Sequence, residues 1–399
     1  MKAARKLTLI LALAMIAGMT SCGVEQTFDT ETTESEVTTE PETSPLKLPE
    51  MTFEGKEMRF LARDHLADKV VRYYSEVMST EENGETMNDA VYRRTMAIED
   101  KYKVKLVNDV SDDVTGTYTN SFLAGDDNWE VVNGGFSKMI GVAVNGGYFA
   151  DLESLPYIDL DNPWWDGRVA NDLSIAGKKF VAIGAMNTWS DSHTYAVIFN
   201  KELAGQYKVD AYGMVDRNEW TLDNFASLLK GVTNDLDGNG EFDENDRYGA
   251  CSENFNFLVH MTGCGAQIMT HDKNGIPEYN FDERFYSAAE KITALMTGGD
   301  CLIAENFRHK ESDPWTNIIR KNFRAGNSLF YVGGIEQLLI FRDLETDIGL
   351  LPSPKFDAKD DYAHTFSVFW ASVMAIPEIC AEKEMAAYLL EAMNYQSSI

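Results

Sequence analysis

The sequence predicts an α/β fold for the body of the chain, which starts near residue 51 and has room for two domains. Short apolar runs typical of strands cover residues 58–62, 104–107 and 129–133. Between the first two runs, residues 87–102 carry apolar side chains at helical spacing. Strands that alternate with helices in this way indicate an open sheet with helices packed on it.

The first residues have the composition of an export signal. Basic residues precede an apolar run from Leu7 to Met19, which has signal-peptide length and is short for a helix that spans a bilayer. Met19-Thr20-Ser21-Cys22 follows and looks like a bacterial lipoprotein cleavage box, although its first position is more usually Leu. We expect residues 1–21 to be removed and Cys22 to carry the lipid that holds the chain on the outer face of the membrane. The alternative is an ordinary secretory signal with an incidental cysteine.

Residues 22–50 read as a disordered acidic tether. They are rich in Thr, Glu, Ser and Pro and contain almost no large apolar residue. Such a segment cannot bury enough surface to offset the entropy lost on ordering. A flexible tether behind a lipidated cysteine suits a binding protein that must reach a permease, and it suits a surface-anchored enzyme equally well.

Charge and cysteine content narrow the function classes. The net charge of −29 excludes a general nucleic-acid binder, which needs a basic face, and favours neutral or cationic ligands. Four cysteines of the body, Cys251, Cys264, Cys301 and Cys380, show no CxxC spacing and no histidine partners, so they do not indicate a metal site. Outside the cell they could form two disulfides, and the three connectivities stay open.

Residues 235–246 have the spacing of a calcium-binding loop. Positions one, three, five, seven, nine and twelve are Asp235, Asp237, Asn239, Glu241, Asp243 and Asp246. The seventh residue supplies its backbone carbonyl, and Gly240 at position six permits the sharp turn. Position twelve is normally Glu, and the shorter Asp reaches an ion through one oxygen. We expect a structural Ca²⁺ here; an acidic turn without an ion is the alternative.

The loop and its surroundings resemble a known family. Residues 219–249, in which Thr221 can cap a helix while Trp220 packs on Phe225, are similar to a stretch of the extracellular solute-binding proteins of bacterial ABC importers, the sugar-binding group that includes maltose-binding protein. Residues 195–203, 323–334 and 348–355 and a final helix over 382–394 resemble further family segments, in the family's order.

The resemblance implies a type II periplasmic-binding-protein-like fold, with two α/β lobes joined by crossover strands and a ligand cleft between them. It places residues 51–194 and 322–376 in the first lobe and residues 195–321 and 377–399 in the second. Members of the family usually continue through further helices, so we expect the second lobe to be incomplete at its C-terminal end.

Two groups of residues are candidates for contacting the ligand. Because ligands of open α/β sheets lie beyond the carboxyl ends of the strands, the first group follows two predicted strands. The second group lies just before the crossovers and supplies aromatic faces on which a sugar ring can stack. The candidates are Arg63, Asp64, His65, Phe136 and Ser137 in the first group, and Trp189, Asp191, Trp315 and Trp370 in the second. Each tryptophan could instead pack in a core.

The resemblance implies capture of a small polar solute, foremost a mono- or oligosaccharide, and its delivery to a membrane permease. Peptides, polyamines and other small solutes stay open as ligands. The sequence contains no G-x-S-x-G, H-E-x-x-H or P-loop motif, so we expect a binding protein and not an enzyme. A surface-anchored carbohydrate-active enzyme and a calcium-dependent adhesion module are the alternatives.

Overall fold

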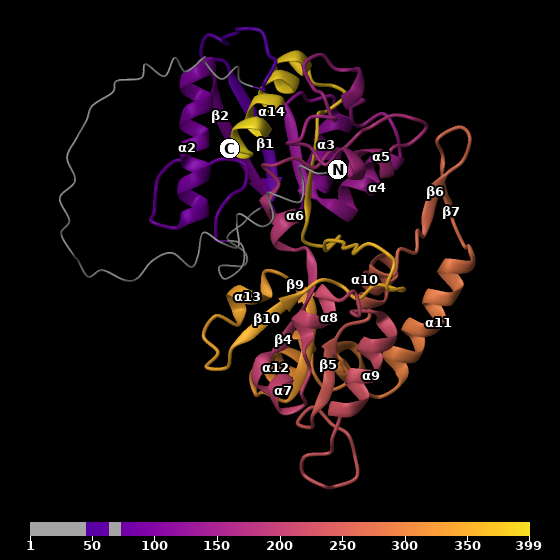
Figure 1. The fold of residues 1–399 in the computed structure, drawn as a ribbon. Helices are drawn as coiled ribbons and strands as arrows, with labels where there is room; N and C mark the ends of the chain where they lie inside the picture. The colour runs from indigo at the N-terminus through magenta and orange to yellow at the C-terminus, as the bar shows by residue number, and fades with distance from the viewer. Residues whose placement is uncertain (1–44, 64–72) are drawn as a thin grey trace, which may run out of the picture. The chain divides into compact units, whose positions relative to one another are not determined.

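A computed structural model describes residues 45–63 and 73–399, which form two larger β-sheets and one two-stranded hairpin (Figure 1). The predicted signal peptide, Cys22 and nearly all of the tether lie outside the described residues, as do Asp64 and His65. In the described part of the chain, no helix is long and apolar enough to cross a membrane.

The first sheet has the strand order β11-β3-β1-β2. Its strands are β1 (Glu57–Arg63), β2 (Lys105–Ser111), β3 (Val131–Gly135) and β11 (Ser372–Ala375). β1 runs parallel to β2 and β3, whereas β11 is antiparallel to β3. The helices after these strands are α2 (Thr86–Tyr102), α3 (Val114–Ala124) and α4 (Phe136–Val144), with the shorter α5 (Gly167–Asp172) and α6 (Thr188–Ser192) further along. The predicted α/β alternation is confirmed.

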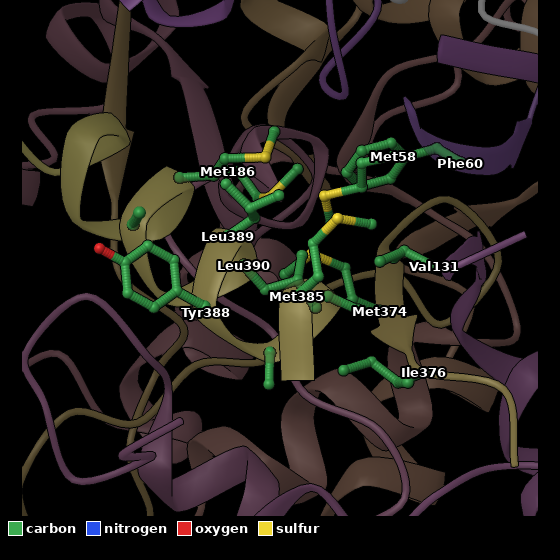
Figure 2. Close-up of a cluster of buried hydrophobic side chains, with 14 of the residues drawn as sticks. Met58, Phe60, Val131, Met186, Met374, Ile376, Met385, Tyr388, Leu389 and Leu390 are labelled. Carbon is green, nitrogen blue, oxygen red and sulfur yellow. The ribbon is translucent and has the colours of Figure 1, made fainter. Parts of the chain in front are cut away.

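The last helix, α14 (Lys383–Ser397), packs against α2 and completes the core of the first sheet (Figure 1). Figure 2 shows Met385, Leu389 and Leu390 of this helix among Met58 of β1 and Met374 of β11. The sequence analysis placed residues 377–399 in the second lobe, and the structure corrects that assignment. The helix is buried on most of its circumference, and the apolar surface that covers it belongs to the first sheet.

The second sheet has the order β10-β4-β9-β5-β8. Its strands are β4 (Tyr195–Asn200), β5 (Tyr248–Ser252), β8 (Cys301–Ile303), β9 (Ser328–Gly334) and β10 (Ile348–Leu351). β4 is antiparallel to β9 and β10, and β5 is parallel to β8 and β9. The assignment of residues 322–376 to the first lobe is therefore wrong for β9 and β10. All seven residues of β9 are buried, because it is the central strand of the second sheet and not a return to the first.

Helices around the second sheet build a separate core. They are α7 (Lys201–Gln206), α8 (Ala211–Asp216), α9 (Leu222–Val232), α10 (Asn256–Gly263), α11 (Glu283–Thr297), α12 (Lys321–Arg324) and α13 (Gln337–Ile340). At the start of α9, the Thr221 hydroxyl accepts a hydrogen bond from the Asn224 amide, and the Trp220 ring lies 5.5 Å from that of Phe225. Both the predicted cap and the predicted hydrophobic staple are confirmed.

Two segments of chain connect the sheets and lie side by side. One leads from α6 into β4, and the other runs from β10 back to β11. The Tyr195 amide donates to the Thr365 carbonyl at 2.8 Å, and Thr194 pairs with Phe366 in an antiparallel bridge. The chain just after β9 joins them, because the Ile335 amide donates to the Thr194 carbonyl at 2.9 Å. These backbone contacts form the hinge region of the molecule.

The hairpin of β6 (Met269–His271) and β7 (Pro277–Tyr279) makes a further contact between the lobes (Figure 1). The amide of Ala176 donates to the carbonyl of Gly275 at 2.8 Å, and a ring nitrogen of His271 donates to the Ser174 carbonyl at 2.9 Å. Ser174 and Ala176 follow α5 of the first lobe, so the hairpin bridges the lobes at a second place, away from the hinge.

Cys251, Cys264, Cys301 and Cys380 are all free thiols, and all are buried. The two disulfides that the sequence allowed are therefore not formed among these residues. Cys380 lies in the core of the first sheet, whereas the other three belong to cores around the second. The Cys251 thiol donates instead to the Ile319 carbonyl and to the Ser328 hydroxyl, each at 3.2 Å, so it serves as a packed and hydrogen-bonded core residue.

Candidate ligand-binding site

A cavity of about 1090 Å³ opens beside the hinge region, at one edge of the second sheet. This volume is at the upper end of the range typical of small-molecule sites. Much of its wall is aromatic. The aromatic side chains come from β4 and β9, from the residues after β5, from the π-helical turns at Trp315–Arg320 and from the connecting segment before β11. They are Tyr195, Phe255, Phe257, Trp315, Tyr331, Phe369 and Trp370.

Three acidic residues of the cavity share one position in the fold. Glu253 follows β5, Glu305 follows β8 and Glu336 follows β9, and these three strands run parallel to one another. Since the carboxyl ends of parallel strands lie at the same edge of a sheet, the topology brings all three carboxylates to the cavity. This is the edge at which open α/β sheets bind their ligands.

Glu253 is held in place by two aromatic side chains of the cavity wall. The Tyr195 hydroxyl donates to one of its carboxylate oxygens at 2.9 Å, and the Trp315 indole nitrogen donates to the other at 2.9 Å. Burial raises the pKa of Glu253, while these two hydrogen bonds act in the opposite direction. A carboxylate oxygen can accept more than one hydrogen bond. Glu253 is thus a fixed acceptor that can also receive bonds from ligand hydroxyl or amino groups.

Glu336 is the most deeply buried acid of the cavity wall, with 8% of its surface exposed. Its Oε1 accepts a hydrogen bond from the side-chain amide of Gln337 at 2.9 Å, whereas its Oε2 has no hydrogen-bond partner among the residues that the structure describes. Burial raises the pKa of Glu336 to about 7. The carboxyl group lies over Gly334, where an added Cβ would overlap with Oε2, so a glycine at this position makes room for the acid.

Trp370 forms an exposed part of the wall, with 42% of its surface accessible. The Arg63 guanidinium carbon lies 5.8 Å from the centre of the Trp370 ring, and its Nη1 donates to the Trp370 carbonyl at 3.3 Å. The ring of His193 stacks on that of Trp370 at 6.2 Å. Arg63, which the sequence analysis proposed as a ligand residue, therefore supports the tryptophan and is not part of the cavity wall.

The other candidates of the first lobe also support the connecting segment. The Phe136 ring packs edge-on against Phe366 at 5.2 Å, and the Ser137 amide donates to the Val368 carbonyl at 3.1 Å. Trp189 is only 2% exposed and packs with Tyr74 in a small apolar cluster of the first lobe.

Neither Trp189 nor the exposed Asp191 is part of the cavity wall. Of the seven candidates that lie in the described residues, the structure places Trp315 and Trp370 there. Sequence reasoning did not find Glu253, Glu305 and Glu336. The signal was present, since each acid comes one or two residues after a buried strand of the second sheet.

The predicted calcium loop brings three carboxylates together. Oxygens of Asp235, Asp237 and Asp246 lie within 4.8 Å of one another. Asp235 also accepts hydrogen bonds from the amides of Gly238 and Gly240, two glycines with positive φ that let the chain curl around it. Asp246 is 2% exposed and accepts the Leu236 amide at 2.8 Å.

The remaining positions of the loop contribute less through their side chains. The side-chain oxygen of Asn239 accepts the Glu241 amide at 2.6 Å, and one carboxylate oxygen of Asp243 accepts the Asn245 amide at 2.8 Å. The carboxylates at positions one, three and twelve thus form an all-oxygen donor set, which is the chemistry that Ca²⁺ prefers. The residues fit a calcium ion, with Asp246 as the buried anchor.

The two sheets, their connecting segments and the cavity beside the hinge define the two-lobed fold of ABC substrate-binding proteins. UspC from M. tuberculosis is similar over 86% of this chain and 78% of that chain, with a TM-score of 0.56 and 13% identity. An ABC substrate-binding protein from Listeria monocytogenes, in complex with cycloalternan, is similar over 85% of this chain and 75% of its own, with a TM-score of 0.52 and 15% identity.

A cyclo/maltodextrin-binding protein complexed with maltotetraose is also similar, over 85% of this chain and 74% of that chain, with a TM-score of 0.54 and 16% identity. No protein-family model matches the sequence, and no curated protein matches it. At these identities the similarity establishes the fold, which is the one the sequence analysis predicted.

Proposed function

We propose that the protein captures a mono- or oligosaccharide in the cavity beside its hinge and delivers it to the permease of an ABC importer. One observation carries the proposal: aromatic faces and fixed hydrogen-bond acceptors line the same cavity. Sugar rings present apolar C–H faces and a rim of hydroxyl groups, so a site for them combines both kinds of wall. Two proteins of similar fold were solved with cycloalternan and with maltotetraose, which supports this ligand class.

The capture mechanism follows from the arrangement of the lobes around the hinge. A ligand on Trp315 of the second lobe also touches Trp370 of the connecting segment, and Trp370 lies on Arg63 of the first lobe. Contacts that exist only when the lobes approach each other stabilise the closed state by the differential affinity of the ligand for it. The closed, loaded form is the one presented to the permease.

Membrane attachment through a lipid on Cys22 is part of the proposal. The folded body would lie on the outer face of the cell membrane, and the segment up to residue 50 would let it reach the permease. No catalytic step is assigned to the cavity. A carbohydrate-active enzyme would differ in turning over its substrate, and an adhesion module in binding a protein partner.

The proposal is tested by tryptophan fluorescence titration with maltotetraose and with a small library of mono- and oligosaccharides. A ligand should change the emission saturably and without turnover. Trp315→Ala and Trp370→Ala should each weaken binding by about tenfold or more, because each removes an aromatic face of the cavity. Trp129→Phe is the matched control, since Trp129 lies in the first lobe, outside the cavity wall, and should leave affinity unchanged.

Two results would contradict this function. One is that no saccharide binds while the protein is folded by its melting curve. The other is steady release of product from an aryl glycoside, which would identify an enzyme.

We also propose that Ca²⁺ binds the loop of Asp235, Asp237 and Asp246 in a structural role. The loop lies between α9 and β5, and its residues are not part of the cavity wall, so the ion would fix the fold and not the ligand. Extracellular calcium sites work with dissociation constants of about 10⁻⁴ to 10⁻³ M, and an Asp at position twelve suits that range.

A further inference from the structure

The cavity carries more negative than positive charge. Glu253, Glu305, Asp313 and Glu336 contribute four carboxyl groups to its wall, whereas the cations of the wall are Arg308 and Arg320. Among residues 45–63 and 73–399, none of the ion pairs includes any of these four acids. Acids in partly buried places are normally paired with a cation or hold a proton, because an unpaired charge is costly there.

The two arginines make their hydrogen bonds and ring contacts with other groups, and only the charge of Arg320 acts on the acids, where it lowers the pKa of Glu253 and of Glu336 against the larger effect of burial. Nε of Arg320 donates to the Gln337 side chain at 2.9 Å, and its Nη1 donates to the Thr316 hydroxyl at 3.1 Å. The Arg308 guanidinium lies over the Trp315 ring, 4.6 Å from its centre. Both groups thus contribute to the cavity wall without making an ion pair with the carboxylates, and the lining is negative when its four acids are ionised.

Glu336 gives the second, independent observation. This side chain is more than nine-tenths buried, belongs to the cavity wall and keeps Oε2 without a hydrogen-bond partner among the described residues. A buried acceptor that lacks a donor is rare in proteins, because it loses its hydration without compensation. Burial raises the pKa of Glu336, and the nearby negative charge of Glu253 raises it further, so a cation at this place would relieve both effects.

The geometry points to a saccharide that carries a protonated amine as the ligand of this cavity, with the amine at the carboxylate of Glu253, close to the negative charge of the buried Glu336, and the ring on the aromatic wall. This inference rests on the proposed function and specifies its substrate class. An ammonium group supplies the donors and the positive charge that the acids lack. The aromatic residues favour it further, since a cation is attracted to the face of an aromatic ring. An anionic saccharide would meet uncompensated repulsion.

A pair of matched trisaccharides tests the inference. Isothermal titration calorimetry of the full-length protein at neutral pH compares the trimer of β-1,4-linked glucosamine with its fully N-acetylated form, which has the same backbone and no positive charge. Maltotetraose serves as a neutral saccharide, and spermidine as an amine without a sugar. We expect the glucosamine trimer to bind about tenfold or more tightly than the acetylated one, because the difference is a charge-assisted hydrogen bond.

Two variants assign the preference to the acids. Glu253→Gln and Glu336→Gln should each reduce the preference for the amine about tenfold while affinity for the acetylated trimer is kept. Glu290→Gln is the control, since Glu290 is exposed on α11 outside the cavity wall, and should keep the full preference. If a melting curve shows that Glu253→Gln does not fold, Glu305→Gln takes its place.

The outcomes separate this inference from the proposed function. Equal or tighter binding of the acetylated trimer, or binding of maltotetraose alone, would overturn the inferred preference for an amine and leave the proposed capture of a saccharide in place. Binding of spermidine alone, or of none of the four compounds, overturns both. An amine preference that survives in both Gln variants also overturns the assignment to these acids.

Discussion

Replacing Glu336 by Gln should make the ligand-free protein more stable at about pH 8. Glu336 is 8% exposed, it makes no ion pair among the residues the structure describes, and its Oε2 has no hydrogen-bond partner there. Gln has nearly the same shape, can accept the same bond from Gln337 and carries no charge. The substitution therefore removes the cost of burying a carboxylate without leaving a cavity.

The size of the effect follows from the pKa of Glu336, which burial raises from 4.5 to about 7. Between these two values the unfolded chain releases its proton while the folded chain keeps it. The contribution of Glu336 to the free energy of unfolding is therefore fully present below about pH 4.5, and it is lost as the pH rises through about 7. The difference corresponds to about 3 kcal/mol at most at alkaline pH.

Urea unfolding at about pH 5 and about pH 8 measures this loss. The wild type should lose about 2.5 kcal/mol more than Glu336→Gln between the two conditions, and Glu290→Gln should follow the wild type. Burial also raises the pKa of other acids, among them Glu76 and Glu391, and these acids lower the stability of both proteins as the pH rises. The effect of Glu336 is therefore measured as the difference between the wild type and Glu336→Gln. Identical pH dependence of wild type and Glu336→Gln would refute the reasoning. The variant should bind an amine more weakly, so stability and binding change in opposite directions.

Three further predictions concern other parts of the chain. Chelation of calcium should lower the melting temperature by about 2 to 4 °C for each kcal/mol of binding energy, and Asp237→Ala should abolish this sensitivity; a wild-type melting curve that ignores millimolar calcium would show that the loop is only a turn. Glu391→Ala should lower the free energy of unfolding in urea by about 3 to 5 kcal/mol, because this buried carboxylate of α14 accepts hydrogen bonds from the indole N–H groups of Trp164 and Trp165. Glu391→Gln should lower it less, and a loss below about 1 kcal/mol for the Ala variant would contradict the prediction. Cys22→Ser should release the protein from the membrane fraction or leave an unprocessed precursor, and full membrane retention of a processed variant would argue against lipidation.

Local pattern was enough to predict the first strands of the chain and two of its helices. The helical spacing at residues 87–102 and the cap at Thr221 correspond to α2 and α9, and the apolar runs of the first lobe correspond to β1, β2 and β3. These signals depend on neighbours in the sequence, which is why they can be read directly. The membership of β9, β10 and α14 in a lobe depends on contacts with strands far away in the sequence, and the local pattern of a segment does not contain that information.

The same limit applies to the candidate site. Trp315 and Trp370 both line the cavity, and both were predicted from their places before expected crossovers. Trp370 does precede β11 of the first lobe, whereas the crossover expected after Trp315 does not exist, because β9 belongs to the second sheet. Trp189 satisfied the same criterion but packs against Tyr74, a contact between residues far apart in the sequence. Glu253, Glu305 and Glu336 needed the strand order of the second sheet, because only parallel neighbours bring residues after different strands to one edge.

The place of α14 in the first lobe has a consequence for the order in which the molecule can fold. The core of the second sheet uses residues between Tyr195 and Leu351, whereas that of the first spans from Phe53 to Met393. In a chain synthesised from its N-terminus, the second lobe has all its core residues available while the first still lacks β11 and α14. Part of the apolar surface of β1 and β3 therefore stays uncovered until the last helix arrives, and it is the surface that a chaperone would shield while the chain folds.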